Sequence, residues 1–336
     1  MALYCGIDLH SNNHVVVVID ENDKMLVNKR IGNDLDETLR LLAPWRDGLV
    51  GVAVESTFNW YWLVDGLMKA GYPLRLVNTT KVQCYSGLKR SGDVQDAFWL
   101  AHLMRLNVLP TGYIYPAGER PLRDLMRRRM HLVQQRSANI LSLQNQVWRN
   151  TGHKLSSNAI KKLDETFAAD VEPLLRQSLQ STWHVIQALD KQIDAIERII
   201  NENVKLRDSF GYLMTTPGIG FTLASTIMLE TGDIGRFKGP GNFASYCRCV
   251  DSERTSNGKK KGEGNSKCGN KYLSWAFVEA ANFAKRYCPQ AQRFYERKKA
   301  KTNTAIATKA LAHKLARASY FQMRDGVAFD AEKLFG

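Results

Sequence analysis

The sequence lacks any long hydrophobic run. Within its 336 residues, no stretch is long and apolar enough to cross a membrane. The opening residues, MALYCGIDLH, also lack the form of a secretory signal. These absences argue against a membrane protein or a secreted one, so we expect no membrane partner and a cytoplasmic location.

Cysteine is scarce as well. The six cysteines fall at irregular spacings, which excludes a disulfide framework and favours a reducing compartment. The nearest approach to a metal-ligand set is Cys247, Cys249 and Cys268. A C-x-C pair with one distant cysteine lacks a convincing fourth zinc ligand, so we expect free thiols here.

Acidic residues are outnumbered, with 33 Asp and Glu against 47 Lys and Arg, a formal net charge of +14. A protein this basic suits a polyanionic partner. The first 60 residues are close to neutral, and the excess lies in later segments that also carry aromatic residues: RPLRDLMRRRMHLVQQR, SNGKKKGEGNSKCGNK, KRYCPQAQRFYERKKAK and KALAHKLARASYFQMR. Basic surfaces with interleaved aromatic rings are typical of nucleic-acid binding.

Against this background, four acidic residues in the first hundred positions are informative. Asp8 (YCGIDLH) and Glu55 (GVAVEST) each end an apolar run of strand type, and Asp93 and Asp96 begin a helical run, DVQDAFWLAHLMRL. The i, i+3 spacing puts the last two on one helical face. If the two strands are neighbours, four carboxylates converge and repel one another unless cations bind. The pattern predicts one or two Mg2+ ions and phosphoryl-transfer chemistry.

The order of predicted elements supports this convergence. Strands are predicted at 3–10, 14–20 and 24–32, then a helix, the strand GVAVES, a second helix, the strand PLRLVN and the helix that carries Asp93. The order βββαβαβα is that of the ribonuclease-H-like fold. In that fold the catalytic carboxylates sit on the first strand, the fourth strand and a late helix. The length of the chain allows two or three domains.

The middle of the chain has almost no strand-type sequence and few glycines. It follows a linker, VLPTGYIYPAGE, and runs from about Arg120 to Val204. A stripe in a/d rhythm consists of Ile186, Leu189, Ile193, Ile196 and Ile200. Such a stripe can be the core of a helical bundle, but its length and charged flanks favour a coiled-coil arm that also dimerises. The arginine run is predicted to be solvated and to contact a nucleic-acid backbone: Arg127, Arg128 and Arg129.

The last third contains two candidate phosphate-binding segments. TTPGIG has the signature of a helix-hairpin-helix, in which Gly218 and Gly220 permit a tight turn that exposes N–H groups to a DNA phosphate. An ordinary turn between helices is the alternative. The loop TSNGKKKGEGNSKCGNK precedes a helix and is predicted to cradle phosphates. Its expected nucleic-acid contacts are Lys259, Lys260, Lys261, Lys267 and Lys271.

Together these motifs resemble the DEDD-type transposases of bacterial insertion sequences, a group that includes Piv-type invertases and bridge-RNA-guided recombinases. The resemblance covers nearly the whole chain. The family pattern TPGIG…E-x-GDI-x-RF is matched by Thr216 to Gly220 and by Glu230 to Phe237. The resemblance implies an α/β plus α architecture in three parts. These are a Holliday-junction-resolvase-like catalytic domain at 1–112, a coiled-coil linker at 113–206 and a mostly helical transposase domain at 207–336.

The resemblance also implies a mechanism. Asp8, Glu55, Asp93 and Asp96 would bind Mg2+, and Ser256 falls on the family's serine nucleophile, which forms a covalent link to DNA. The sequence departs from the family pattern around that serine. It has Ser256-Asn257-Gly258 in place of Ser-Gly, Val250-Asp251 in place of Pro-Arg, and Ser274 in place of an arginine. Ser252 is therefore the second candidate.

The implied partners are double-stranded donor and target DNA and a noncoding guide RNA in a bacterial cell. A site shared between protomers implies a dimer or tetramer. Two alternatives stay open: a Holliday-junction-type nuclease that uses water, and a non-catalytic nucleic-acid-binding scaffold. A sugar-kinase or actin-like ATPase shares the strand order and the motif GID. It needs a second, related lobe, which the helical and basic C-terminal half does not provide.

Overall fold

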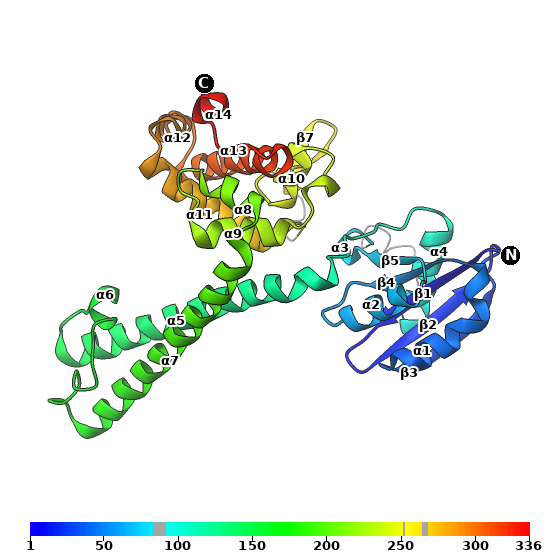
Figure 1. The fold of residues 1–336 in the computed structure, drawn as a ribbon, viewed down its shortest axis with the longest axis horizontal. Coiled ribbons are helices and arrows are strands. Elements are labelled where there is room, and N and C mark those ends of the chain that lie inside the picture. Colours follow the sequence, from blue (N-terminus) through cyan, green and yellow to red (C-terminus); the bar gives the residue numbers. More distant parts are fainter. Residues whose placement is uncertain (83–91, 251–252, 264–267) are drawn as a thin grey trace. The chain divides into compact units, whose positions relative to one another are not determined.

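The computed structural model describes residues 1–82, 92–250, 253–263 and 268–336. These residues form two compact units, Met1–Gly118 and Glu119–Gly336 (Figure 1). The second unit combines most of the expected linker, 113–206, with the expected transposase domain, 207–336. None of the helices in the described part of the chain is long and apolar enough to cross a membrane.

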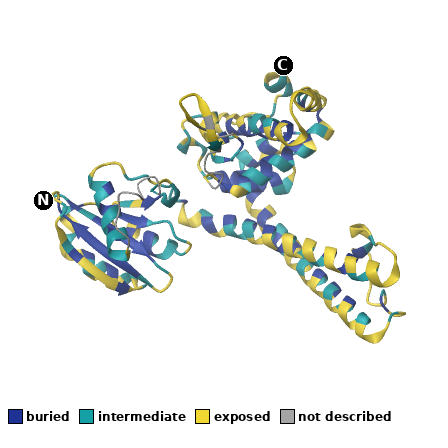
Figure 2. Cartoon of the chain, turned by 180° about the vertical axis from the view of Figure 1, so that it is seen from behind, coloured by how far each residue is buried: buried dark blue, intermediate teal, exposed yellow. Residues whose placement is uncertain are grey.

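A mixed five-stranded sheet forms the N-terminal unit. Its strands are β1 (Leu3–Leu9), β2 (Asn13–Ile19), β3 (Met25–Gly32), β4 (Leu49–Glu55) and β5 (Leu74–Val77). Their order in the sheet is β3-β2-β1-β4-β5; β1 and β3 run antiparallel to β2, while β4 runs parallel to β1 and to β5. The apolar runs of β1, β2 and β4 are buried almost throughout, as Figure 2 shows. The element order predicted from the sequence is confirmed.

Helices cover both faces of this sheet. On one face, α1 (Leu35–Leu42) and α2 (Tyr61–Lys69) pack their leucines against Cys5 and Ile7 of β1. On the other face, α4 (Asp93–Arg105) packs Ala97 and Ala101 against valines of β2. The shorter helices of this unit are η1 (Ala43–Gly48), α3 (Thr79–Val82) and η3 (Ala117–Glu119).

Helix α4 lies unusually close to β1 because Gly6 has no side chain. A Cβ atom added at Gly6 would meet the carbonyl oxygen of Ala97 at 2.0 Å and the amide nitrogen of Ala101 at 2.9 Å. Since side chains alternate along a strand, Asp8 lies on the same face of β1 as Gly6. The glycine therefore brings the acidic first turn of α4 close to Asp8.

The other end of α4 is held by Asp23, which lies between β2 and β3 with φ of 64°. Its carboxylate accepts hydrogen bonds from Arg105 Nε at 2.7 Å and from Arg105 Nη2 at 2.6 Å. His102 Nδ1 lies 2.9 Å from the same carboxylate. Burial opposes the negative charge, but these hydrogen bonds outweigh it and lower the pKa of Asp23. The helix is thus attached at its C-terminal end as well.

We expect Asp23→Asn to lower the free energy of unfolding at pH 7 by about 1–2 kcal/mol, because it removes a bidentate charge-assisted pair. Asparagine tolerates the left-handed backbone, so the substitution adds no strain. The folded-state pKa lies below the ordinary value of 3.8. The stabilisation is therefore present above that value and is lost as the pH falls through the folded-state pKa. Urea unfolding of wild type and Asp23→Asn, at neutral and at strongly acidic pH, measures the size of the effect and its pH dependence. If the two proteins still differed in stability in acid, the effect would not come from this ion pair.

The C-terminal unit is mostly helical. Its elements are α5 (Arg120–Thr151), α6 (Ser157–Ile160), α7 (Pro173–Val204), α8 (Asp208–Met214), α9 (Phe221–Thr231), η4 (Ile234–Arg236), α10 (Pro240–Tyr246), β6 (Glu253–Ser256), β7 (Lys259–Glu263), α11 (Lys271–Tyr287), α12 (Pro289–Lys301), α13 (Thr304–Asp325) and α14 (Ala331–Phe335). The long helices α5 and α7 lie side by side (Figure 1). A proline begins each of them, at N1 or N2, where its missing N–H has no cost.

The predicted isoleucine stripe lies on α7 and is buried within the chain. Ile186 packs with Ile140 and Leu143 of α5, and Ile193 and Ile200 enter the main core of the unit. The coiled coil therefore forms between α5 and α7 of one chain, and the interpretation of this stripe as a dimerisation surface is wrong. The same core contains residues of α9, α11 and α13, so the helical arm and the transposase segment are one packed body.

Two further segments predicted from motifs have structural roles in this unit. Gly218 has φ of +92°, and a Cβ atom there would meet the amide nitrogen of Ala284 at 2.5 Å, so the turn between α8 and α9 packs directly on α11. Cys247 and Cys249 are buried, and burial raises the pKa of both thiols, that of Cys249 to about 12.

Candidate active site

The acids predicted from the sequence lie at one edge of the N-terminal sheet. Ile7 of β1 pairs with Val54 of the parallel strand β4, and Asp8 and Glu55 each come one residue later. The two strands therefore carry their acids to the same edge. Asp93 is the first residue of α4, with Asp96 in the same turn. Asp8 is 4% exposed, so its carboxylate is a buried charge in need of a partner.

Three side chains at this edge approach closely enough to share a ligand. Among the described residues, Asp8, His10 and Asp93 each offer one ligand atom within 4.8 Å of the other two. Glu55 and Asp96 lie outside that group. The structure thus brings together two of the four predicted acids and adds a histidine that the sequence-based prediction missed.

His10 occupies the space between the two aspartates. Its Nε2 atom lies 3.3 Å from Asp8 Oδ2 and 3.4 Å from Asp93 Oδ2. That nitrogen is buried but makes no hydrogen bond of ordinary geometry with another described residue. The His10 carbonyl accepts hydrogen bonds from the side-chain amides of Asn33 at 3.1 Å and Asn59 at 2.9 Å, which fix the backbone here. The D-x-H spacing after a buried strand was the signal that could have found it.

Arg30 on β3 holds Asp93 from the solvent side. Its Nη2 lies 2.5 Å from Asp93 Oδ2, and its Nη1 donates to Asn13 Oδ1 at 2.8 Å. The hydrogen bond from Arg30, helped by the nearby charge of His10, lowers the pKa of Asp93 below its ordinary value. Asp93 is therefore a carboxylate, not a carboxylic acid, at neutral pH.

The residues present fit a divalent cation. Two ligands at right angles around an ion with bonds of about 2.1 Å lie about 3 Å apart, close to the separations around His10 Nε2. Carboxylate oxygens suit Mg2+ and Mn2+, and an imidazole nitrogen is more favourable to Mn2+. The buried nitrogen of His10, left without a hydrogen bond by the described residues, is the kind of atom that a cation would satisfy.

The predicted serine nucleophile lies on a β-hairpin rather than in an irregular loop. Ser256 of β6 pairs with Lys259 of β7, and Asn257 (φ 50°) and Gly258 (φ 69°) form the turn between them. Two left-handed residues of sequence Asn-Gly are typical of a tight hairpin turn, a signal that the sequence analysis overlooked. Ser256 is exposed at the end of this hairpin.

Of the predicted lysine contacts, the described ones lie on β7 and at the start of α11. Lys259 and Lys261 are exposed, as is Lys271, whose Nζ lies 5.1 Å from the centroid of the Tyr272 ring. The side chain of Lys260, all of Lys267, and Ser252, the second serine candidate, lie outside the described residues.

Comparison with known proteins identifies the family. A profile of DEDD-type IS110 transposases matches residues 5–185, more than half of the chain, and a profile described as transposase IS116/IS110/IS902 family matches residues 211–296. The chain belongs to the IS110 family of insertion-sequence transposases. The resemblance inferred from the motifs is thereby confirmed. Membership of this family makes the protein an enzyme that cleaves and rejoins DNA, and it agrees with the use of a divalent metal.

Two of three individual relatives align with most of the transposase. A probable family 20 transposase of Pseudomonas aeruginosa is 22% identical over 293 residues, 84% of each chain. The transposase for insertion sequence element IS1111A of Coxiella burnetii is 20% identical over 289 residues, 84% of this chain and 78% of the relative. The transposase for insertion sequence element IS1328 of Yersinia enterocolitica is 28% identical over 145 residues, 42% of this chain and 43% of the relative.

The arginine run of this transposase is not the solvated surface that the sequence predicted. Arg127 donates to both carboxylate oxygens of Glu230, at 2.5 and 2.7 Å, and Arg129 donates twice to Glu197 Oε1, at 2.8 and 2.5 Å. Arg128 between them is exposed. The prediction of a solvated surface is wrong for Arg127 and Arg129 because α5 directs them toward acids of α9 and α7.

We expect Arg127→Ala to lower the free energy of unfolding by about 3 kcal/mol, because it leaves the buried carboxylate of Glu230 without its cation. The estimate is at the low end of the usual range, since the Arg127 side chain is still 31% exposed. Arg128→Ala is the matched control, with the same substitution one position along the same helix and no buried acid to strand. Chemical denaturation of both variants measures the difference; equal stability of the two would show that the pair with Glu230 contributes little.

Proposed function

We propose that this transposase cuts and rejoins DNA by combining two sites, a metal site in a ribonuclease-H-like N-terminal unit and a serine nucleophile in the C-terminal unit. The observation that carries the proposal is the convergence of Asp8, His10 and Asp93 within 4.8 Å where β1 ends and α4 begins. A scaffold that only binds nucleic acid has no need of a buried aspartate next to a second acid and a histidine.

Asp8, Glu55, Asp93 and Asp96 are the proposed ligands of one or two Mg2+ ions, and His10 joins Asp8 and Asp93 in the set. When bound, such an ion polarises a DNA phosphate and neutralises the negative charge that develops on it. The chain's own residues keep the site in order. Arg30 keeps Asp93 ionised, and Asn33 and Asn59 fix the position of His10.

Ser256 is the proposed attacking group. Its Oγ forms a bond to phosphorus while the bond from phosphorus to one deoxyribose oxygen breaks, and the serine proton goes to the solvent as that oxygen is protonated. The phosphoserine link retains the energy of the phosphodiester, so the reverse attack by a deoxyribose hydroxyl rejoins DNA. The exposed position of Ser256 on the hairpin suits attack on a large substrate.

Basic and backbone groups of the C-terminal unit are the proposed contacts to nucleic acid. Exposed cations flank Ser256 on the hairpin and begin α11: Lys259, Lys261 and Lys271. Gly220 is the N-cap residue of α9, and no side chain of its own can accept a hydrogen bond from the first N–H groups of the helix. We propose that these N–H groups bind a phosphate. Arg128 remains a candidate contact on α5. Following the family resemblance, we propose that a guide RNA selects donor and target DNA and that a dimer or tetramer assembles the complete site.

The test is a search for a covalent protein–DNA adduct on a denaturing gel. The full chain with its copurifying RNA, Mg2+ or Mn2+, and DNA carrying the junction of its own element are incubated together. Wild type is compared with Ser256→Ala, Ser252→Ala and Asp96→Ala. We expect the adduct to disappear in Ser256→Ala and in Asp96→Ala, and to persist in Ser252→Ala.

Two other outcomes contradict the proposal in different ways. Cleavage without an adduct that survives Ser256→Ala but not Asp96→Ala would indicate a nuclease that activates water. DNA binding without cleavage under any metal would indicate a scaffold.

A further inference from the structure

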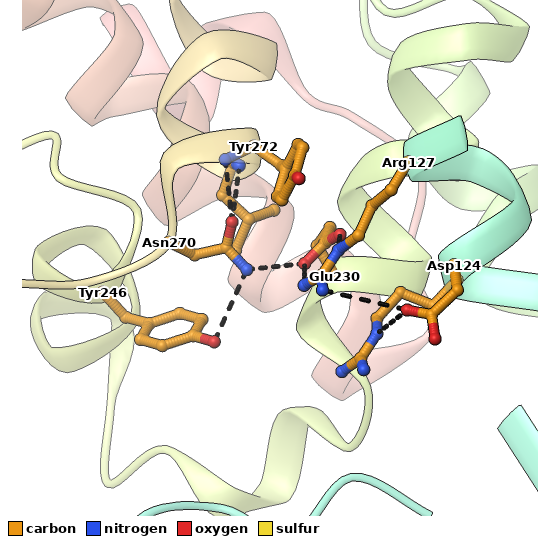
Figure 3. Close-up of polar contacts among 8 residues, drawn as sticks. Asp124, Arg127, Glu230, Tyr246, Asn270 and Tyr272 are labelled. Atoms are coloured by element: carbon orange, nitrogen blue, oxygen red, sulfur yellow. Dashed lines mark hydrogen bonds and ion pairs between the residues drawn. The ribbon is translucent and has the colours of Figure 1, made fainter. Parts of the chain in front are cut away.

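We infer that Arg127, Glu230 and Asn270 form a clamp that positions the segment bearing Ser256. The clamp lies at the point where that segment returns to the helical core, at the first turn of α11 (Figure 3). The inference rests on the proposed function in one respect, the role of Ser256; the existence of the clamp does not depend on it.

Glu230 is the centre of the clamp. It lies near the end of α9, is 3% exposed, and receives three hydrogen bonds from side chains of two other segments. Arg127 of α5 donates from Nε at 2.5 Å and from Nη2 at 2.7 Å, and Asn270 donates from Nδ2 at 2.7 Å. Burial opposes the charge on Arg127, but the hydrogen bonds and charge of Glu230 outweigh it and raise the pKa of Arg127 above its usual range. The ion pair thus joins α5 to α9, and the same carboxylate also accepts the hydrogen bond from Asn270.

Asn270 uses both ends of its side-chain amide. While Nδ2 donates to Glu230, Oδ1 accepts from the backbone of Tyr272 at 2.8 Å and of Leu273 at 3.2 Å, and so caps α11. An aspartate in this position would retain the cap but lose the donor. The cap on α11 needs only Asn270 Oδ1. The hydrogen bond from Asn270 Nδ2 to Glu230 is therefore an additional constraint that formation of the helix does not require.

The two ends of the serine segment meet at the clamp. The backbone N–H of Asn270 donates to the carbonyl of Tyr246 at 2.7 Å. Arg248 Nη2 donates to the carbonyl of Gly269 at 3.0 Å. Gly269 has φ of +90°, and a Cβ atom there would lie 2.5 Å from the Tyr246 carbonyl oxygen. The chain that leaves α10 and the chain that enters α11 are therefore fixed side by side. The β6–β7 hairpin that carries Ser256 lies between these two points in the sequence.

Two of the three charged residues of the E-x-GDI-x-RF motif, Glu230 and Arg236, lie at the clamp. Glu230 begins the motif, and Arg236 near its end stacks over the ring of Tyr246, with Cζ 4.6 Å from the ring centroid. The Tyr246 hydroxyl in turn lies 3.5 Å from Asn270 Nδ2. Glu230 and Arg236 thus both contact residues at the base of the serine segment, whereas Asp233 is exposed and caps η4.

Reversing the direction of the hydrogen bond between positions 230 and 270 gives a direct test. Asn270→Asp keeps the cap on α11 but places two carboxylates about 3 Å apart, where they repel each other. Glu230→Gln keeps the shape but weakens the bond to Arg127. The double variant E230Q/N270D restores a hydrogen bond between positions 230 and 270 in the opposite direction. Gln134→Ala, a substitution at an exposed position of the same helix with no role in the proposed site, serves as the control on α5.

Three quantities are measured on the full chain with its copurifying RNA: the rate of adduct formation with junction DNA, the affinity for that DNA, and amide hydrogen exchange at residues 246–249 and 268–273. All are taken at a temperature where every variant is folded by circular dichroism. We expect Asn270→Asp to slow adduct formation by about a hundredfold, since small misplacements of a nucleophile have large effects. DNA affinity should stay within about threefold, exchange at both segments should rise together, and E230Q/N270D should recover about tenfold of the lost rate.

Two results overturn the inference. One is an adduct rate and an exchange pattern in Asn270→Asp equal to those of wild type. The other is a slow rate that E230Q/N270D does not improve at all, which would make Asn270 a helix cap and nothing more. Failure of the proposed function can be told apart from failure of the clamp. If Ser256 is not the nucleophile, Ser256→Ala forms as much adduct as wild type. The hydrogen-exchange measurements decide independently whether the clamp exists.

Discussion

Asp8→Asn abolishes DNA cleavage, on our account, while the protein remains folded. Mutation of a residue that only contacts a metal ligand typically lowers metal affinity or activity by about 10–100-fold. Loss of a buried direct ligand should therefore reduce the single-turnover cleavage rate by more than about a hundredfold. The asparagine has the shape of the aspartate it replaces, and it removes a buried negative charge, so we expect no loss of stability. The rate is measured with junction DNA at saturating Mg2+ and again at saturating Mn2+.

Asp36→Asn is the control for that variant. Asp36 lies in the first turn of α1 in the same unit, is exposed, and undergoes the same change of charge. It should cleave DNA at the wild-type rate. If Asp8→Asn retained more than about a tenth of the wild-type rate, the buried carboxylate would not be part of the reaction centre, and the metal site would have to lie elsewhere.

Gly6→Ala is expected to have the largest effect on structure. The added methyl carbon would lie 2.0 Å from the carbonyl oxygen of Ala97, a backbone atom that cannot rotate away. Overpacking of this kind costs about 1–3 kcal/mol and here should reach the upper end or exceed it. Relief requires α4 to move off β1, which carries Asp93 away from Asp8 and His10. We therefore expect a lower melting temperature together with a loss of Mn2+ affinity of at least about tenfold.

Gly32→Ala separates this effect from the general cost of replacing a strand glycine. Gly32 ends β3 in the same sheet, and a Cβ atom there would meet nothing within 4 Å. This variant should keep both its melting temperature and its affinity for Mn2+, which a paramagnetic titration of the full chain measures. Normal Mn2+ binding by Gly6→Ala would show that the close packing of α4 is not what assembles the site.

The N-terminal unit was largely predictable because local signals and fold agree there. The apolar strand runs and the order of elements specify one sheet, which places Asp8 and Glu55 at neighbouring strand ends. His10 was missed for a physical reason. It lies beyond the end of β1, and the hydrogen bonds of Asn33 and Asn59 to its carbonyl help to fix its position between the acids. Those contacts join segments that are far apart in sequence.

The C-terminal unit was less predictable because its charges are paired through tertiary contacts. The three consecutive arginines of α5 suggest a solvated face, but two of them meet acids from α9 and α7. Periodicity identified the buried stripe of α7, yet it does not say whether the partner helix belongs to the same chain; here it is α5. The hairpin of Ser256 was predictable from Asn257-Gly258 and was hidden by the glycine- and lysine-rich composition around it.

The most direct test of the account is to identify the residue that becomes attached to DNA. After reaction with junction DNA, the adduct is digested with nuclease and protease, and the modified peptide is sequenced by mass spectrometry, in parallel reactions with Mn2+ and with a chelator. The account predicts a nucleotide phosphate on Ser256 that forms only with the metal and is lost in Asp8→Asn. A phosphate on another residue, or an adduct that forms equally in the chelator, would contradict it.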